Sequence, residues 1–486
     1  MRLTREGRSV ALGSRGTALL SALAGARGGV VSREALIEAA WPGRAVEEAN
    51  LTVQVAALRR ALGAWADTER DWIVTVPRVG YRLVVESAPG PPAVAVLPFE
   101  NLSSDPEQSY LADGIVEDLI TALSRFRTFS VVARNSTFAY KGRAVDVRSI
   151  ARDLGVRYVL EGSVRRSGSR VRISAQLIEG GSGAHLWADT FDGAGVDIFD
   201  FQDEITRSVI GLIEPQIRRA EIERVRQSRP ESLGAWDLYL QALPLVYAAD
   251  AAGYTTAISL LDRALAIDPA YGPALAMASF AHEKRRTFGG VAPPGVDDAE
   301  LAMALAGRAL QVDPQDATAL ALLGWQRILF RRDYGGLALC ARAYELNPNN
   351  RAVLDLVSVA HLFAGRLDDA IACATRALEL SPGAPDAYMC ANHISSAHLF
   401  ARRFHAGIEW AQRSIDLEGR YVFSHLNLAV GRAHLGQIES ARLAMNAVMA
   451  LRPDFTIGKK GFDCHRFPER RDVFIEGQRM AGMPEA

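Results

Sequence analysis

The N-terminal fold is decided by the stretch WPGRAVEEANLTVQVAALRRALG (41–63) and, after a short polar connector, WIVTVPRVGYRL (72–83). In the first part, apolar side chains recur at the i, i+4, i+7, i+11 spacing of one helical stripe: Leu51, Val55, Leu58 and Leu62. This period predicts an amphipathic helix over Glu47–Leu62, with the stripe buried.

The second part predicts a two-stranded β-ribbon with Arg78 at its tip and a turn at Gly80–Tyr81. A helix that fits the major groove, followed by a basic ribbon, is how a winged helix-turn-helix holds double-stranded DNA. Residues 1–88 contain 12 Arg against 9 Asp and Glu, whereas the whole chain has a net charge of −1. The charge excludes a generally basic nucleic-acid coat protein and is compatible with a local DNA-binding patch.

This first segment resembles the OmpR/PhoB-type winged-helix family, most closely its CadC-like branch, over about residues 5–84. The resemblance implies a first helix at Leu12–Leu23 and a second helix, SREALIEAAW, capped by Ser32. Ala35 stands where a capping box has Glu, so the box is incomplete. The resemblance also makes Glu47–Leu62 the recognition helix. Neither a receiver domain before it nor a membrane helix after it is expected.

The resemblance indicates which face of the recognition helix is free, and the candidate DNA-binding residues follow: Asn50, Thr52, Gln54, Arg59, Arg60, Arg78 and Tyr81. Asn50 and Gln54 suit paired hydrogen bonds to adenine edges, with a solvated helix face as the alternative for Gln54. Arg59 and Arg60 suit phosphates, and Arg78 suits the minor groove or the backbone. Tyr81 is expected to pack its ring while its hydroxyl reaches a phosphate, and Trp72 to pack against the helices. Alanines at 49, 56 and 57 replace groups that often contact DNA in relatives, so fewer phosphate contacts are expected.

A proline-rich linker at 88–92 separates the winged helix (1–87) from a second segment at 93–228. Its apolar patterns predict a strand at Val94–Phe99, a helix at Ser109–Phe126, a strand at Phe129–Ala133, a helix at Val147–Leu154, strands at Tyr158–Val164 and Arg170–Ile178, and a long helix at Asp200–Arg226. This alternation predicts an α/β domain. The stretches AVLPFENLSSDPEQSYLADGIVEDLITAL, FAYKGRAVDVRSIARDLGVRYVLEGSVRRSG and LWADTFD resemble the TolB-like domain of bacterial regulators and of some class III adenylate cyclases. The resemblance implies a sensing or docking role.

The third segment repeats itself. Its endings are RALAIDP (to Pro269), RALQVDP (to Pro314), RAYELNP (to Pro348), RALELSP (to Pro382), RSIDLEG (to Gly419) and AVMALRP (to Pro453). They lie 45, 34, 34, 37 and 34 residues apart, and 34 is the tetratricopeptide period. Twelve positions before each ending stands a small residue: Ala257, Ala302, Gly336, Ala370, Gly407 and Ala441. About six tetratricopeptide repeats are therefore expected over 233–453, with a longer loop at 287–298 and a capping segment at 454–486.

Stacked helix hairpins of this kind present a concave surface that binds peptides or other proteins. Three aromatic residues, Trp325, Tyr388 and Trp410, either line that surface or fill the core, and the pattern leaves both options open.

Sequence patterns typical of catalysis or metal binding are missing. There is no GxxxxGK[ST] phosphate loop and no GxSxG elbow. The four cysteines, Cys340, Cys373, Cys390 and Cys464, lack zinc-site spacing. Asp113 and Glu117 share one helix face, but no partner His or Lys is expected near them, so a solvated surface is expected. We therefore expect no enzyme activity, no catalytic residue, no cofactor and no metal.

Together these patterns predict a multidomain chain: a winged helix-turn-helix (α+β), an α/β TolB-like domain and an all-α tetratricopeptide-repeat solenoid. The expected function is a soluble, cytoplasmic transcriptional regulator that binds double-stranded DNA as a homodimer and a protein or peptide through its repeats. No membrane contact is expected, because no run of about 18 apolar residues occurs. The alternatives are a protein-interaction scaffold whose winged helix docks protein, and a regulatory relative of the TolB-like/repeat adenylate cyclases.

Overall fold

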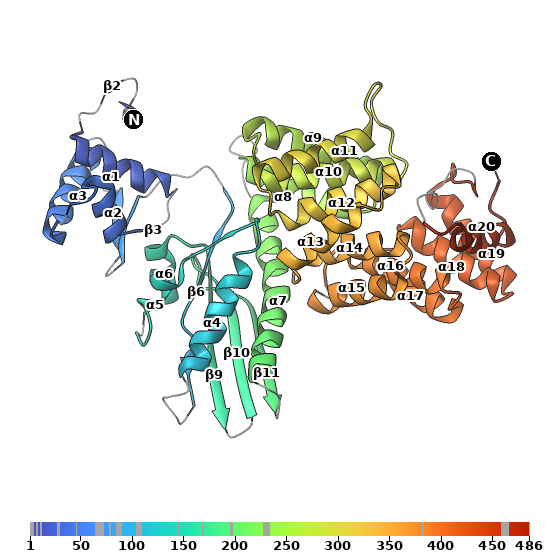
Figure 1. The fold of residues 1–486 in the computed structure, drawn as a ribbon, viewed down its shortest axis with the longest axis horizontal. Coiled ribbons are helices and arrows are strands. Elements are labelled where there is room, and N and C mark those ends of the chain that lie inside the picture. Colours follow the sequence, from blue (N-terminus) through green and yellow to red (C-terminus); the bar gives the residue numbers. More distant parts are fainter. Residues whose placement is uncertain are drawn as a thin grey trace. The chain divides into compact units, whose positions relative to one another are not determined.

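The computed structural model describes residues 4–5, 8–9, 12–26, 30–44, 46–63, 72–76, 79–83, 90–103, 109–143, 145–167, 170–194, 198–226, 234–381, 383–457 and 466–485. Arg78, Cys464 and the first two residues of the predicted linker lie outside them. The chain divides into two compact units, Met1–Thr206 and Arg207–Ala486, which are drawn together in Figure 1. No helix among the described residues is long and apolar enough to cross a membrane.

The first unit begins with three helices and a small antiparallel sheet. The elements are β1 (Thr4–Arg5), β2 (Arg8–Ser9), α1 (Ser14–Gly25), β3 (Val30–Ser32), α2 (Arg33–Ala40), α3 (Glu48–Gly63), β4 (Ile73–Val76) and β5 (Gly80–Leu83). Strand β5 pairs with β3 on one side and β4 on the other. Leu51, Val55 and Leu58 of α3 are buried in a core shared with α1, α2 and the sheet. This confirms the predicted stripe, except that Leu62 at its end is only partly buried.

Two local predictions about this domain have different outcomes. The Ser32 hydroxyl accepts a hydrogen bond from the Ala35 amide at 3.2 Å, so the predicted cap of α2 is present. The predicted turn at Gly80–Tyr81 is wrong, because both residues belong to β5. Glycine is needed here because β5 and β3 approach closely: a Cβ at Gly80 would lie 1.9 Å from the Val31 carbonyl oxygen. Any side chain there would push β3 off the sheet.

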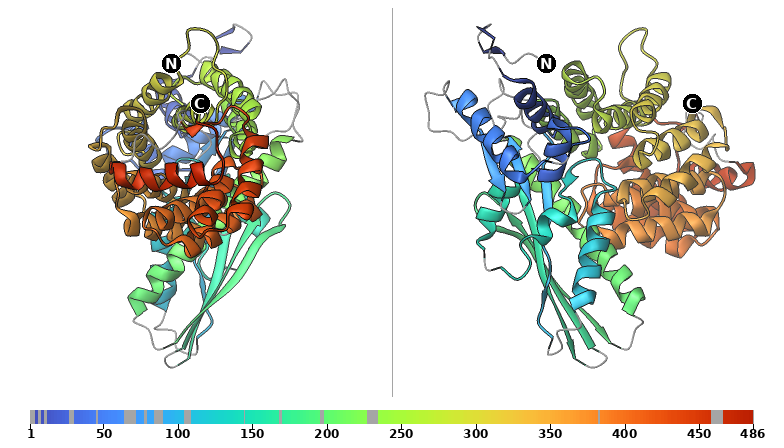
Figure 2. Two further views of the ribbon diagram at one scale, coloured as in Figure 1. Left: turned by 90° about the vertical axis from the view of Figure 1, so that its right-hand side faces the viewer. Right: turned by 60° about the vertical axis from the view of Figure 1, so that its left-hand side comes forward.

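The second part of the first unit is an α/β domain around a six-stranded sheet. Its elements are β6 (Ala93–Val96), β7 (Glu100–Asn101), α4 (Ser109–Leu123), β8 (Ser130–Val131), α5 (Arg134–Phe138), α6 (Val147–Leu154), β9 (Tyr158–Ser167), β10 (Arg170–Glu179), β11 (His185–Ala194) and the start of α7 (Ile198–Arg226). The strand order is β11-β10-β9-β6-β8, with β7 also paired to β9. Strands β6, β7 and β8 are parallel to their partners, whereas β9, β10 and β11 form the long antiparallel ribbon seen in Figures 1 and 2.

One hydrophobic core joins this domain to the winged helix. Val76 of β4 is fully buried in a cluster with Ile150 and Leu154 of α6, and Val79 packs against the same cluster. Beside it, Arg82 of β5 donates to the carbonyl oxygen of Arg152 at 2.7 Å. Burial lowers the pKa of Arg82, and the charge of Asp153 opposes that shift. Contacts with the α/β domain therefore hold the β4–β5 ribbon in place, in addition to the contacts within the winged-helix domain.

The second unit is a stack of antiparallel helix pairs, shown from green to red in Figure 2. The pairs are α8 (Ala235–Tyr247) with α9 (Ala251–Ile267), α10 (Gly272–Thr287) with α11 (Asp298–Val312), α12 (Ala317–Arg331) with α13 (Gly336–Leu346), α14 (Arg351–Phe363) with α15 (Leu367–Leu380), α16 (Ala387–Phe400) with α17 (Phe404–Leu417), and α18 (Val422–His434) with α19 (Ile438–Leu451); α20 (Pro468–Met480) follows. Residues 288–297 lie between α10 and α11, which confirms the predicted longer loop. The structure confirms the predicted repeat fold.

The small residues that recur in the repeats are all buried where the two helices of a pair meet. In three pairs a serine of the first helix donates to the carbonyl oxygen of that residue: Ser279 to Ala302 at 2.8 Å, Ser358 to Ala370 at 2.9 Å and Ser395 to Gly407 at 2.7 Å. In a fourth pair two glycines face each other, and a Cβ on Gly336 would lie 2.1 Å from the Gly324 carbonyl oxygen. Larger side chains would separate the helices, which explains the spacing in the sequence.

Aromatic rings fill the inside of the stack. Tyr388 of α16 packs on Tyr421 with ring centroids 4.7 Å apart, and Tyr421 packs on Phe288 at 5.4 Å. The Tyr388 hydroxyl donates to the carbonyl oxygen of Tyr247, 141 residues earlier, at 3.3 Å. The first helix pair is thereby tied to the fifth.

Candidate nucleic-acid interface

Half of the exposed residues of α3 are apolar. The exposed residues are Glu48, Ala49, Asn50, Thr52, Val53, Ala56, Ala57 and Arg60. Val53 has 61% of its surface exposed, whereas Gln54 is half-buried at the edge of the face. Because 3.6 residues make one turn, Asn50, Val53 and Ala57 lie along one line on the helix. This line lies opposite the buried stripe and is open to solvent.

Polar contacts organise the beginning of α3. Arg33 of α2 forms an ion pair with Glu48, with 3.0 Å between Nη1 and Oε2. The Thr52 hydroxyl donates to the Glu48 carbonyl oxygen at 3.2 Å. The ion pair neutralises one acidic group at the helix start, where negative charge would repel phosphates. Both candidates Asn50 and Thr52 are exposed there.

Arg59, which suits a phosphate by its position in the sequence, is engaged inside the domain. Its Nε and Nη2 donate to the Ile73 carbonyl oxygen at 2.8 and 2.6 Å, and Nη2 also donates to the Thr75 hydroxyl at 2.8 Å. These bonds tie α3 to β4. No helical period could reveal them, since the partners are 14 and 16 residues further along the chain.

The other candidates differ in exposure. Arg60 is exposed, with Nε 3.4 Å from the Ala56 carbonyl oxygen. Tyr81 is 95% buried in β5, and the Arg59 guanidinium lies 6.0 Å from its ring centre. Trp72 is half-buried, and its indole nitrogen has no hydrogen-bond partner among the described residues. Arg78, which the sequence predicts at the tip of the ribbon, lies outside the described residues.

The acidic residues on α4 have partners that the sequence did not reveal. Lys141 lies 2.6 Å from the Asp113 carboxylate, and Arg134 lies 3.8 Å from Glu117. The expectation that no lysine is near was wrong, because Lys141 follows α5 and reaches back across 28 residues. Burial, together with the charge of Asp203, raises the pKa of the neighbouring Asp118. The side chains of both ion pairs are partly exposed to water, so the pairs belong to the protein surface.

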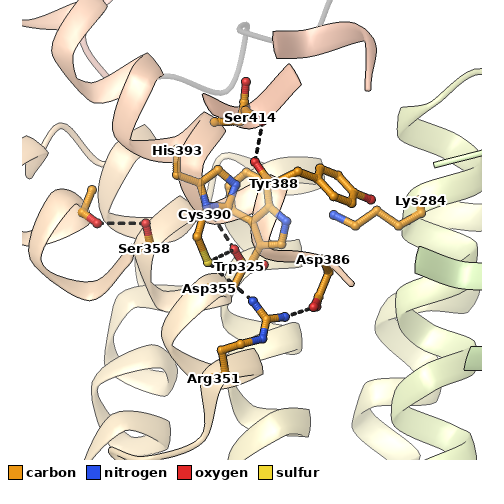
Figure 3. A network of polar contacts seen from close by, with 12 residues as sticks. Lys284, Trp325, Arg351, Asp355, Ser358, Asp386, Tyr388, Cys390, His393 and Ser414 are labelled. Atoms are coloured by element: carbon orange, nitrogen blue, oxygen red, sulfur yellow. Dashed lines mark hydrogen bonds and ion pairs between the residues drawn. The ribbon is translucent and has the colours of Figure 1, made fainter. Parts of the chain in front are cut away.

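The inside of the repeat array is the second candidate site, and Figure 3 shows its polar network. Asp355 of α14 accepts from the Cys390 thiol at 3.1 Å and lies 3.3 Å from His393 Nδ1. Nearby, Arg351 forms an ion pair with Asp386. Trp325 and Tyr388 are buried in the core, so of the two options the aromatics fill the core, while Trp410 is half-exposed.

Cys390, His393 and Asp355 have the residue types of a nucleophilic site, but their environment opposes that role. Burial, followed by the charge of Asp355, raises the pKa of the Cys390 thiol well above its usual value. A catalytic cysteine needs a lowered pKa and access to solvent. Burial also disfavours the charged form of Asp355, but His393 and Arg351 outweigh it and lower its pKa to about 2. The network is a buried ion cluster that links α14 to α16.

Two protein families match parts of the chain. Residues 7–83 match the family described as transcriptional regulatory protein, C terminal. Residues 92–208, which resemble a TolB-like domain in sequence, match the second domain of HilA/YgeH-like transcriptional regulators.

Two curated relatives share parts of the chain. "Putative adenylate cyclase 3" of Rhizobium meliloti (strain 1021) is 40% identical over 290 residues, or 57% of this chain and 47% of that protein. Transcriptional regulator HilA of Salmonella typhimurium is 28% identical over 185 residues, or 36% of this chain and 32% of HilA. The chain thus spans less than half the length of either relative. Among solved structures, the peptide-binding TPR protein YrrB aligns with 40% of this chain and 93% of its own, at 13% identity and a TM-score of 0.27.

Proposed function

From a chain that joins an OmpR/PhoB-type winged-helix domain to a HilA-like second domain and a helical-repeat array, we propose a transcriptional regulator that binds promoter DNA through α3. The observation that carries the proposal is the free face of α3, with Asn50 and Arg60 exposed on a helix whose other side is anchored in a core. A helix held in this way can enter the major groove while its flanking groups contact phosphates. We place the activity in the cytoplasm, where DNA is accessible.

The salt dependence of DNA binding tests this role. Arg60→Ala is expected to reduce the slope of log K against log salt by about one unit, because one phosphate contact and its released counterion are lost. The measurement is a titration of the full chain against duplex DNA at several salt concentrations. Arg263→Ala, the same change at an exposed arginine of α9, is the matched control and should leave the slope unchanged. Equal slopes for Arg60→Ala and the unmodified chain would remove Arg60 from the interface.

Arg59 has a different predicted role. Its hydrogen bonds to β4 make it a positioning residue for the ribbon, although its charge still adds to the local potential. We further propose that two copies bind a repeated half-site, because one winged helix with few phosphate contacts covers little DNA. The repeat array would then bind a protein or peptide on its outer surfaces, since its inside is filled by side chains.

Adenylate cyclase activity is the second candidate, suggested by the name of the 40% identical relative. The purified full chain is expected to be inert toward ATP, because Asp355 and Cys390 of its buried network bond to each other and are closed to solvent. Formation of cyclic AMP above the rate of a protein-free blank would favour the cyclase. If the chain is instead a protein-interaction scaffold, it should bind no duplex DNA even at low salt.

A further inference from the structure

We propose that α3 recognises thymine 5-methyl groups in the major groove, with Val53 as the principal reading residue. This inference rests on the proposed function and adds the chemical class of the base step that is read. It comes from one juxtaposition: an exposed valine surrounded by exposed alanines on the face of α3 opposite the core.

The exposure of these residues sets the geometry. Ala49, Val53, Ala56 and Ala57 occupy positions i, i+4, i+7 and i+8 and are all exposed, so they form one apolar strip. Val53 has 61% of its surface open, whereas Val55 two residues later is buried in the core. Ala49 and Val53 lie in the N-terminal half of the helix, which is the part that contacts base edges in helix-turn-helix proteins, and Ala56 and Ala57 lie just past its middle.

The chemistry of the groove then selects the ligand. Thymine is the base that presents a methyl group in the major groove, and small apolar side chains contact it there. The alanines carry only one carbon beyond the backbone, so they let α3 approach the base edges closely. Asn50 borders the strip and offers paired hydrogen bonds to an adjacent adenine. An adenine beside a thymine is thus the step that this surface matches.

Charge favours DNA over a protein as the occupant. Arg60 borders the strip toward the C-terminal end, and the ion pair of Arg33 with Glu48 neutralises an acidic group at the other end. A cation beside an apolar strip on a helix of a winged-helix domain fits a groove bounded by phosphates. Protein docking is the competing outcome of the experiment below.

The experiment uses the full chain and the tightest-binding duplex selected from a random-sequence library at fixed ionic strength. Each thymine of that duplex is replaced in turn by deoxyuridine, which removes the 5-methyl group and leaves the hydrogen-bonding groups in place. At one or two positions the affinity is expected to fall about fourfold, the effect of exposing one buried methyl group. In Val53→Ala, the ratio of the affinities for the thymine and the uracil duplex is expected to fall below about twofold at one of these positions.

The matched control is Val291→Ala, the same change at a valine that is 88% exposed in the loop between α10 and α11. It should leave the ratio unchanged. Equal binding of the thymine duplex and every uracil duplex would overturn the inference while the proposed DNA binding stands. A ratio that persists unchanged in Val53→Ala would overturn the assignment to Val53. Selection of no duplex at low salt would overturn both and favour protein docking.

Discussion

Asp355→Ala is expected to lower the unfolding free energy of the repeat array by about 1–3 kcal/mol, because it leaves the buried Cys390 thiol and His393 without their shared acceptor. Asp355 lies beside His393 and Cys390, and its side chain is only 8% exposed. Denaturant unfolding of the full chain, with hydrogen exchange followed in α14 and α16, would measure the loss. The control is Asp368→Ala, which removes a 92% exposed carboxylate paired with Arg403 at 3.3 Å. An exposed ion pair contributes at most about 1 kcal/mol, so similar losses in the two variants would contradict the buried role of Asp355.

Asp355 is also expected to make the stability of the repeat array fall at acid pH. Its pKa is lowered from 3.8 to about 2 in the folded chain. The stability linked to this shift is therefore fully present above about pH 4, falls as the pH passes from 4 toward 2, and is about 2 kcal/mol in total. Asp355→Asn should flatten the stability of the array in this pH window. If the stability of Asp355→Asn depends on pH as in the unmodified chain, other carboxylates cause the loss of stability in acid.

Val76→Asp is expected to destabilise the first unit by about 3–5 kcal/mol, because it places a carboxylate in a core without a partner. Val76 is fully buried between the β4–β5 ribbon and α6 of the second domain. We also expect weaker DNA binding, since the ribbon loses its support on α6. Hydrogen exchange in β4, β5 and α6, together with duplex titration, would detect both effects.

Val53→Asp is the control for stability, because it makes the same change at an exposed valine of the same domain. Its unfolding free energy should stay within about 0.5 kcal/mol of the unmodified chain, as for most surface substitutions. If the unfolding free energy of Val76→Asp also stays within about 0.5 kcal/mol of the unmodified chain, the core shared with α6 does not support the ribbon.

Local periodicity made much of the fold predictable. The Leu51, Val55 and Leu58 stripe, the helix at Val147–Leu154 and the 34-residue repeats all follow from contacts between neighbours in sequence. Strand β11 was not predicted, because its described residues are exposed or half-exposed and the alternation of buried side chains is missing. Helix α5 was also missed, as its five residues make barely more than one turn.

The candidate site was less predictable, since long-range partners decide the role of each side chain. Asn50 and Thr52 are exposed on the helix face that the period indicates. Arg59 looks equivalent to Arg60 in the sequence, yet it bonds to β4, which lies beyond the polar connector. The support of Val76 comes from α6, more than seventy residues later. Neither contact has a sequence signature.

The bond from Tyr388 to Tyr247 has a consequence for how the array loses its structure. In an open array each repeat touches only its neighbours, so the terminal repeats fray independently and stability grows with repeat number. Here the Tyr388–Tyr247 bond joins the fifth helix pair to the first, and the Tyr421–Phe288 ring contact joins the start of α18 to the end of α10. The early repeats therefore cannot detach without breaking contacts of the late ones. Unfolding should then be all-or-none across α8–α18, and deleting the first helix pair should cost far more than one repeat's share of the stability.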